Sequence, residues 1–484
     1  MKKTVVISLL LLIVVVACTP RNLTATPESS IVLEDCILTS PRGNQVEARC
    51  GTLTVPEDRA NPDARRIDLH VAVIPAIKRD PEPDALFLLA GGPGQSAIET
   101  FPAMINLMFQ VHEDRDIVLV DQRGTGESQP LRCLDPEDDE SLTDEQALAL
   151  YKACPETLDA DLRFYTTEIA MTDLDEVRAA LGYDVLNLYG ASYGTRAALT
   201  YLRMFPERVR TLTLDAVVDP GFVMFMDAAE DGQAALENFF ARCEADEACS
   251  TAFPDLRMEF GELLSRFDQA STNITIPHPL THEPLDLTVT RQMITNMVFN
   301  TLYVPDLVAT LPVSIHAAYA DENYVPLISQ ALLVNAGLYD GMFYAVACSE
   351  DAPLISAEAA AERSEESIFG DRTVDFAEVC AEWPKGEVSE EFRHPVLSDV
   401  PVLILSGAAD PITPPRHAEA IAEGLTNELH LVFSGMGHGN LTTRCSINIF
   451  KDFIETASTQ GLDTDCVESI QPPPFFVDFS GPRP

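Results

Sequence analysis

Residues 190–194, which read Gly-Ala-Ser-Tyr-Gly, decide the fold of this chain. They follow an apolar, strand-like run at 185–189 and precede a helical pattern at 195–205. A serine on such a sharp strand-to-helix turn stands clear of the backbone, and free N–H groups at the helix start face any oxyanion that forms there. We therefore predict a nucleophile elbow with Ser192 at its tip.

Apolar runs and helical patterns alternate on both sides of the elbow. The run at 85–90 is apolar throughout, as in strands that are buried on both faces of a sheet. Such alternation predicts a mostly parallel sheet with helices on both faces. The expected fold class is α/β, with a doubly wound sheet of the α/β-hydrolase type. The expected strands are 51–55, 66–77, 85–90, 116–120, 185–189, 209–214, 401–407 and 428–433.

The alternation stops between residues 220 and 395, where helical patterns dominate. We interpret 220–395 as an inserted, mainly helical lid, with the hydrolase core at 36–219 and 396–470. The Pro-rich tail 471–484 is expected to lie over the surface. The expected lid helices are 231–243, 256–270, 291–302, 326–336 and 357–367. The expected core helices include one from an N-cap at Thr172 to Gly182, another at 415–424 and a third at 446–456.

Three polar residues follow successive strand ends in the order Ser192, Asp410 and His438, which is the chain order of an α/β-hydrolase triad. A serine hydroxyl needs a base to accept its proton, and histidine titrates near neutrality. A carboxylate then orients the imidazole and stabilises the imidazolium. We prefer Asp410 because it directly follows a core strand after the insertion. The remaining candidates are Asp215 for the acid, and His417 and His430 for the base.

The oxyanion hole of such a site uses two backbone N–H groups. One belongs to the residue after the nucleophile, which is Tyr193. The other comes from the loop after an earlier strand, here the Gly-Gly-Pro-Gly segment at 91–94. We expect Gly92 to be the second donor.

The composition is that of a globular protein, but the charge is strongly negative. The 484 residues include 32 basic and 76 acidic side chains, a formal net charge of −44. Long-range repulsion therefore makes nucleic acid and anionic membrane surfaces poor partners. The acidity is typical of a solvated surface; the alternative is attraction of cationic ligands, including peptide N-termini.

The N-terminus has the pattern of a targeting segment. Lys2 and Lys3 precede a mostly apolar run at 5–17 that is too short to span a bilayer comfortably. The run ends in Val-Val-Ala before Cys18, which resembles a bacterial lipobox and implies cleavage and lipidation at Cys18. Residues 19–35 would then be a flexible tether. An ordinary signal peptide with an incidental cysteine is the alternative.

Eleven cysteines are present, and removing Cys18 leaves ten, an even number in an exported chain. Spacing does not determine connectivity, so sequential pairing is a hypothesis. No Cys-x-x-Cys pair or His-rich tract indicates a metal site, and no cofactor is implied. The proposed pairs are Cys36–Cys50, Cys133–Cys154, Cys243–Cys249, Cys348–Cys380 and Cys445–Cys466.

The motifs at 91–94, 121–128, 190–194, 407–414 and 437–439 together resemble the proline iminopeptidase and tripeptidyl aminopeptidase family, most closely its exported tripeptidyl branch. The resemblance runs from about residue 36 to 466 and is least specific in the lid. One departure is Ala90, where proline iminopeptidases usually carry a histidine.

The resemblance implies an exported serine aminopeptidase that acts on short peptides. Such an enzyme needs an anion for the substrate's α-ammonium group, and the family uses lid acids for it. Glu350 and Asp351 stand in the matching segment.

Two other functions remain open. A carboxylesterase or lipase would use the same fold and triad. A catalytically silent surface lipoprotein would bind peptides or a partner. The sequence leaves open the residue preference, the number of residues released and the oligomeric state.

Overall fold

The computed structural model describes residues 31–41, 43–134, 142–268, 270–279, 281–332 and 337–482. The predicted signal segment, its lipidation residue Cys18 and most of the predicted tether lie outside these ranges. The sheet begins at Glu34, two residues before the expected start of the core.

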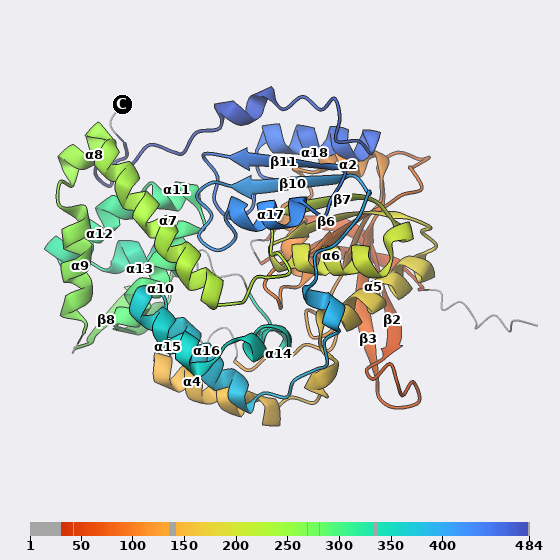
Figure 1. Ribbon diagram of the computed structural model, residues 1–484, viewed down its shortest axis with the longest axis horizontal. Coiled ribbons are helices and arrows are strands. Elements are labelled where there is room, and N and C mark those ends of the chain that lie inside the picture. Colours follow the sequence, from red (N-terminus) through yellow and green to blue (C-terminus); the bar gives the residue numbers. More distant parts are fainter. Residues whose placement is uncertain are drawn as a thin grey trace, which may run out of the picture.

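A nine-stranded sheet forms the centre of the molecule, with the order β1-β2-β3-β5-β4-β6-β7-β10-β11 (Figure 1). The first three strands pair antiparallel and the remaining strands run parallel. The expected fold class is confirmed; the edge strand β1 was not predicted. The strands are β1 Glu34–Thr39, β2 Gln45–Pro56, β3 Arg66–Ile74, β4 Leu86–Leu89, β5 Ile117–Val120, β6 Leu186–Ala191, β7 Val209–Asp215, β10 Val402–Gly407 and β11 Glu428–Phe433.

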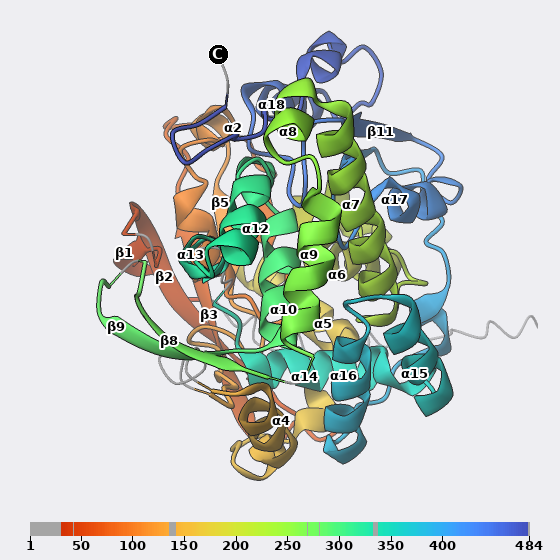
Figure 2. The same cartoon turned by 90° about the vertical axis from the view of Figure 1, so that its left-hand side faces the viewer.

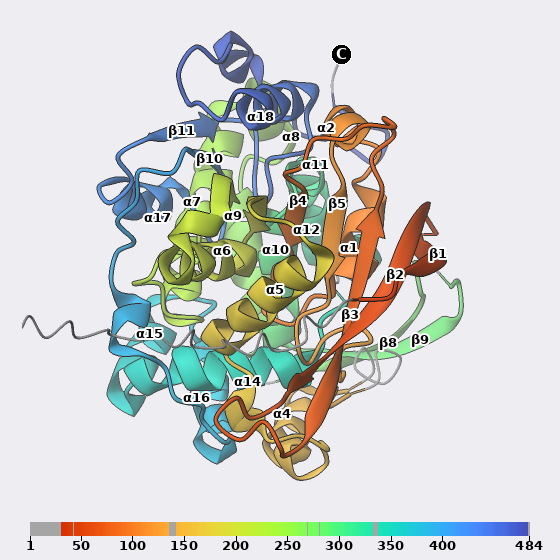
Figure 3. The same ribbon diagram turned by 90° about the vertical axis from the view of Figure 1, so that its right-hand side faces the viewer.

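Helices cover both faces of this sheet (Figure 3). Successive residues of β4 point to opposite faces, so Phe87 and Leu89 join one core while Leu86 and Leu88 join the other. The first core also contains α5, α6 and α17, and the second contains α1, α2 and α18. These helices are α1 Ala97–Thr100, α2 Phe109–Asp114, α5 Thr167–Leu181, α6 Tyr193–Met204, α17 Pro415–Ala422 and α18 Arg444–Thr456.

The chain leaves the sheet after β7 and returns at β10, and the segment between them is mainly helical, as expected (Figure 2). All five predicted lid helices are present, with ends shifted by up to several residues. The hairpin of β8 Thr272–Pro277 and β9 Pro284–Val289 was missed. The lid helices are α7 Met226–Ala245, α8 Glu247–Ala252, α9 Leu256–Arg266, α10 Arg291–Leu302, α11 Pro305–Val308, α12 Leu311–Ala320, α13 Val325–Leu332, α14 Asp340–Glu350, α15 Ala357–Glu366 and α16 Asp371–Glu382.

One local prediction was wrong and another was incomplete. Helix α5 has its N-cap at Thr166, six residues before the expected N-cap at Thr172, because Ala170 and Met171 already pack into the core. Its end at Gly182 is confirmed, with a left-handed φ of 87°. The described part of the Pro-rich tail lies mostly at the surface, as expected, but Phe475 is buried in the lid core, edge-on to Phe239 at 5.8 Å.

The core and the lid are joined by a segment that precedes the elbow. Helix α4, Asp144–Ala153, packs against α16 on the lid side. The Trp383 indole N–H donates to the Tyr151 carbonyl at 2.9 Å, and the Thr290 hydroxyl donates to Asp144 at 3.1 Å. The helix at the edge of the core therefore supports the lid.

All five predicted disulfides are present, each between cysteines that are neighbours in sequence. Cys348–Cys380 joins α14 to α16 within the lid. Such a set of disulfides is typical of proteins outside the cytoplasm. Within the described ranges, no helix combines the length and apolar character that a membrane span requires.

Candidate active site

Ser192 lies at the tip of a strained turn between β6 and α6. Its backbone has φ 55° and ψ −126°, a conformation that non-glycine residues rarely adopt. The flanking glycines make the turn possible. A Cβ on Gly190 would lie 2.2 Å from the Gly194 carbonyl oxygen, and a Cβ on Gly194 would lie 2.3 Å from the Leu89 carbonyl oxygen. This is the geometry of the predicted nucleophile elbow.

His438 contacts Asp410, as predicted, with 2.9 Å between its Nδ1 and the carboxylate Oδ2. Asp410 also accepts hydrogen bonds from the backbone N–H groups of Ile412 and Thr413 and from the Thr413 hydroxyl, at 2.8 to 2.9 Å. These bonds fix the carboxylate. A donating Nδ1–H leaves the imidazole Nε2 free to act as a base.

The electrostatics of this pair favour an ionised acid. Burial raises the pKa of Asp410, but the His438 charge and the hydrogen bonds outweigh it and hold the pKa below its ordinary value. Burial lowers the pKa of His438, whereas the charge and hydrogen bond of Asp410 raise it, and the net pKa lies above the ordinary value. The pair is therefore suited to stabilise an imidazolium.

Asp215, the alternative acid, instead connects the two catalytic loops. Its backbone carbonyl accepts the Ser192 N–H at 2.9 Å. Its buried carboxylate accepts the backbone N–H groups of Asn440 and Leu441, the Asn440 side-chain amide and the Tyr189 hydroxyl, at 2.8 to 3.0 Å. One residue thus holds both the elbow and the loop that carries His438.

The two alternative bases have other partners. His417 is buried between two carboxylates, with Nδ1 at 2.5 Å from Asp219 and Nε2 at 2.8 Å from Asp231. Although burial opposes it, these hydrogen bonds raise the pKa of His417 to about 9. His430 lies in β11 and bonds to the Ser406 hydroxyl at 2.9 Å. Both ring nitrogens of His417 and the Nε2 of His430 are therefore engaged in contacts with residues other than Ser192.

The Gly-Gly-Pro-Gly loop lies against the nucleophile. A Cβ on Gly91 would approach the Ser192 Cβ to 3.1 Å. Gly92 has a left-handed φ of 101°, and the Gly91 N–H already donates to Gln95. Across the described chain, no residue accepts a hydrogen bond from the N–H of Gly92 or of Tyr193. The two expected oxyanion donors are thus free to bind substrate.

Glu350 and Asp351, at the end of α14, differ in their surroundings. Asp351 is paired with two arginines, Arg196 at 3.1 Å and Arg393 at 2.8 Å. Glu350 accepts the backbone N–H and the hydroxyl of Thr167, at 2.7 and 3.0 Å. Its partner Arg196 lies farther away, at 3.7 Å. The charge of Asp351 is therefore compensated more fully than that of Glu350.

Glu350 is also the acid connected to the elbow. The Thr167 hydroxyl that bonds to Glu350 lies 2.8 Å from the Tyr193 hydroxyl. Burial raises the pKa of Glu350 to about 7, against the opposing effects of Arg196 and the Thr167 hydrogen bonds. Of the two predicted lid acids, Glu350 is thus the one linked through Thr167 to the Tyr193 side chain.

Sequence reasoning missed a lid residue that contacts the base. The Tyr303 ring lies edge-on to the His438 ring at 5.0 Å, and the Tyr303 carbonyl accepts the His438 N–H at 3.0 Å. A Cβ on Gly437 would come within 2.6 Å of that carbonyl oxygen, so the glycine is required for the approach. Nothing near Tyr303 in the sequence signals this contact.

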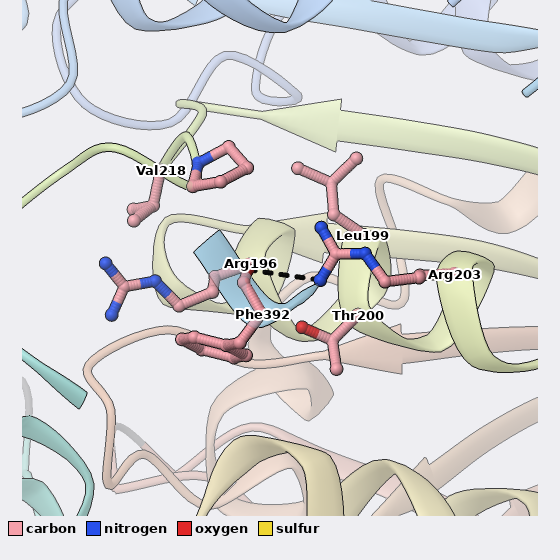
Figure 4. Close-up of a pocket in the computed structure, with 7 residues that line it drawn as sticks. Arg196, Leu199, Thr200, Arg203, Val218 and Phe392 are labelled. Atoms are coloured by element: carbon pink, nitrogen blue, oxygen red, sulfur yellow. Dashed lines mark hydrogen bonds between the residues drawn. The ribbon is translucent and has the colours of Figure 1, made fainter. Parts of the chain in front are cut away.

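A small pocket lies beside α6 (Figure 4). The Arg203 guanidinium donates to the Phe392 carbonyl across it, at 3.1 Å. Ser192, Asp410 and His438 do not line it, so we assign no substrate to it. The lining residues are Arg196, Leu199, Thr200, Arg203, Val218, Pro220 and Phe392.

Comparison with known proteins identifies the fold family and several relatives. The alpha/beta hydrolase fold family matches residues 84–443. Serine protease Hip1 of Mycobacterium tuberculosis (strain H37Rv) is 27% identical over 435 residues, 81% of each chain. Tripeptidyl aminopeptidase of Streptomyces coelicolor is 34% identical over 192 residues, 36% of this chain and 35% of that protein. Carboxylesterase B of Mycobacterium tuberculosis (strain CDC 1551) is 28% identical over 431 residues, 81% of this chain and 80% of that protein.

Proposed function

The chain belongs to the alpha/beta hydrolase fold family, and we propose that it is an exported serine aminopeptidase that releases short peptides or single residues from peptide N-termini. The coarser assignment, a serine hydrolase related to serine proteases, follows from the family match and from the relatives.

The reaction proceeds through an acyl-enzyme on Ser192. His438 Nε2 accepts the hydroxyl proton as the oxygen attacks the scissile carbonyl, and Asp410 stabilises the imidazolium. The oxyanion is held by the N–H groups of Gly92 and Tyr193. The imidazolium then gives its proton to the leaving amine, and water releases the acyl group by the same steps in reverse.

The position and pKa of Glu350 are the main support for the aminopeptidase proposal. An aminopeptidase must bind the substrate's α-ammonium group, whereas an esterase has no such requirement. Glu350 is buried, is tied to the elbow through Thr167, and ionises near neutral pH. A carboxylate has about four acceptor sites, so the two bonds from Thr167 leave capacity for an ammonium ion.

Export and membrane attachment complete the proposal. The five disulfides support a location outside the cytoplasm. We extend this to a lipid anchor on Cys18, which would hold the enzyme on the cell envelope, in the periplasm or at the outer surface, with short peptides as substrates. Radiolabelled palmitate should label the full chain in cells and not a Cys18→Ala variant.

A carboxylesterase is the second candidate, because the similarity to carboxylesterase B covers as much of this chain as the similarity to Hip1. Ester and amide acyl transfer use the same catalytic groups. The two functions therefore differ in substrate rather than in triad.

Hydrolysis of a matched panel by the protein without residues 1–18 tests the proposal. The panel contains free-amine mono-, di- and tripeptidyl amides, their N-blocked forms and short-chain p-nitrophenyl esters. Amide cleavage that requires the free amine and is lost in Ser192→Ala supports the aminopeptidase. Ester cleavage alone, indifferent to an amine, refutes it. Failure of Ser192 to react with a fluorophosphonate probe would instead favour a catalytically silent binding protein.

A further inference from the structure

Arg372, on helix α16 of the lid, is a cation without an acidic partner. Its guanidinium lies over the rings of Phe225 and Phe299, with 5.2 and 4.7 Å to the ring centres. No hydrogen bond or ion pair joins Arg372 to any other residue that the structure describes. Asp375, one turn further along α16, accepts a hydrogen bond from the Gln292 amide instead.

The arginines of the lid differ in whether they have an acidic partner. Arg257, also in the lid, stacks on the Phe240 ring at 4.7 Å and contacts both Glu237 and Glu244. Arg363 likewise contacts two glutamates. These two lid arginines therefore have acidic partners among the described residues, whereas Arg372 and Arg242, whose guanidinium lies over the Phe475 ring at 4.2 Å, have none.

Two series of aromatic contacts connect Arg372 to the catalytic groups. On one side Phe299 contacts Tyr303 at 5.6 Å, and Tyr303 contacts His438 at 5.0 Å. This series leads from the guanidinium to the catalytic base.

On the other side Phe225 contacts Phe343 at 6.1 Å. Phe343 lies against the oxyanion loop, since a Cβ on Gly94 would approach its backbone nitrogen to 3.2 Å. The Arg372 guanidinium therefore lies between two series of aromatic contacts. One series reaches His438, and the other reaches the Gly-Gly-Pro-Gly loop.

The chemistry of the group matches a carboxylate ligand. Burial lowers the pKa of Arg372, and the negative charge of Asp375 opposes this only in part. Arg372 is partly buried and has no hydrogen-bonded acid, so its guanidinium is available to pair with a carboxylate. Guanidinium binds carboxylate through two parallel hydrogen bonds, an interaction that a single ammonium group does not reproduce.

We propose that Arg372 binds a carboxylate of the substrate and makes the enzyme selective for peptides that carry one near the cleaved bond. This inference rests on the proposed function, because it takes the substrate to be a peptide. The carboxylate has two sources, an acidic side chain or the C-terminus of a short peptide.

The experiment compares substrates that differ only in that charge. Tripeptidyl amides with Glu or Gln at the cleaved residue test the side-chain source. Tetraalanine and its C-terminal amide test the C-terminal source. The enzymes are the wild type, Arg372→Met, Arg372→Lys and the control Arg257→Met, which removes a lid arginine that already has acidic partners.

The wild type should prefer the charged member of at least one pair by about tenfold to a hundredfold in kcat/KM, the usual range for a hydrogen bond to a charged group. Arg372→Met should abolish the preference while neutral substrates change less than threefold. The control variant Arg257→Met should keep the wild-type preference for the charged substrate. Arg372→Lys should retain only part of the preference for the charged substrate. If Arg372→Met does not fold, Arg372→Lys is compared with the wild type instead.

Equal losses on charged and neutral substrates in Arg372→Met, or no preference in the wild type, would overturn the proposal. Failure of the aminopeptidase assignment is recognised separately, when no amide is cleaved. In that case p-nitrophenyl hemisuccinate and butyrate replace the peptides as the charged and neutral pair. Binding of the same pairs to Ser192→Ala, measured by calorimetry, gives a readout that needs no turnover.

Discussion

The carboxylate of Asp215 accepts hydrogen bonds from both the backbone N–H and the side-chain amide of Asn440, at 2.8 to 2.9 Å. Asn440 lies two residues after His438, and the Asp215 carbonyl also accepts the N–H of Ser192. The end of strand β7 therefore sets the separation of nucleophile and base, although Asp215 itself touches neither functional atom.

Asp215→Asn should lower kcat by at least about tenfold with little change in KM. An amide NH₂ in place of one carboxylate oxygen faces donors, and each unsatisfied buried donor costs about 1–3 kcal/mol. The loop that carries His438 would shift, and small misplacements of catalytic groups have large effects on rate. Steady-state kinetics and thermal unfolding of the variant test this. Unchanged kcat with a normal melting temperature would show that Asp215 does not position the site.

The pH profile should report the His438–Asp410 pair. Because the pKa of His438 lies above its ordinary value and the base must be neutral, kcat/KM should rise with pH to an inflexion above about 6.5. In Asp410→Asn the charge that raises this pKa is removed, so the inflexion should move to lower pH. The rate should fall by about ten-thousandfold, as in other serine triads. An inflexion that stays in place would exclude Asp410 as the partner.

Glu350→Gln should lower kcat/KM for free-amine peptides by about tenfold to a hundredfold, because a charge-assisted contact to the ammonium group is lost. N-blocked peptides and esters should be cleaved as before. Because the pKa of Glu350 is about 7, the preference of the wild type for free amines should weaken as pH falls below 7 and the carboxylate is protonated. The measurement is the ratio of the two rates between pH 5 and 8. Equal losses on blocked and free substrates would assign Glu350 a structural role.

His417 should stabilise the attachment of the lid below pH 9. It links Asp219, after β7, to Asp231 on lid helix α7. Its folded pKa, about 9, exceeds the ordinary value of 6.5, so the stabilisation is complete below pH 6.5 and is lost as pH rises through 9. The difference corresponds to at most about 3 kcal/mol.

Thermal unfolding of the wild type should therefore show a lower melting temperature at pH 10 than at pH 7. His417→Gln should melt at a lower temperature at pH 7 and should show a smaller decrease between the two pH values. His316→Gln, which alters a half-exposed histidine paired with Glu259, is the control and should behave as the wild type. Identical pH dependence in His417→Gln would contradict the prediction.

Much of the fold could be predicted because its signals are local. Apolar runs such as 85–90 and 401–407 became strands buried on both faces. The elbow could be recognised because Gly190 and Gly194 permit a turn that larger residues would block. The hairpin of β8 and β9 was missed because its short alternating strands stand among helical patterns, and the start of α5 was misplaced because Thr172 has the appearance of an N-cap.

The sequence by itself determined the α/β order, the serine elbow and the chain order of the candidate triad, since each depends on local patterns along the chain. Only the tertiary structure decided that Asp410 contacts His438, whereas Asp215 forms hydrogen bonds with the elbow and with the loop that carries His438. It likewise placed Tyr303 against the base and left Arg372 without an acid. Those relations join residues tens to hundreds of positions apart, and their distances depend on how the lid packs on the sheet, which no local pattern encodes.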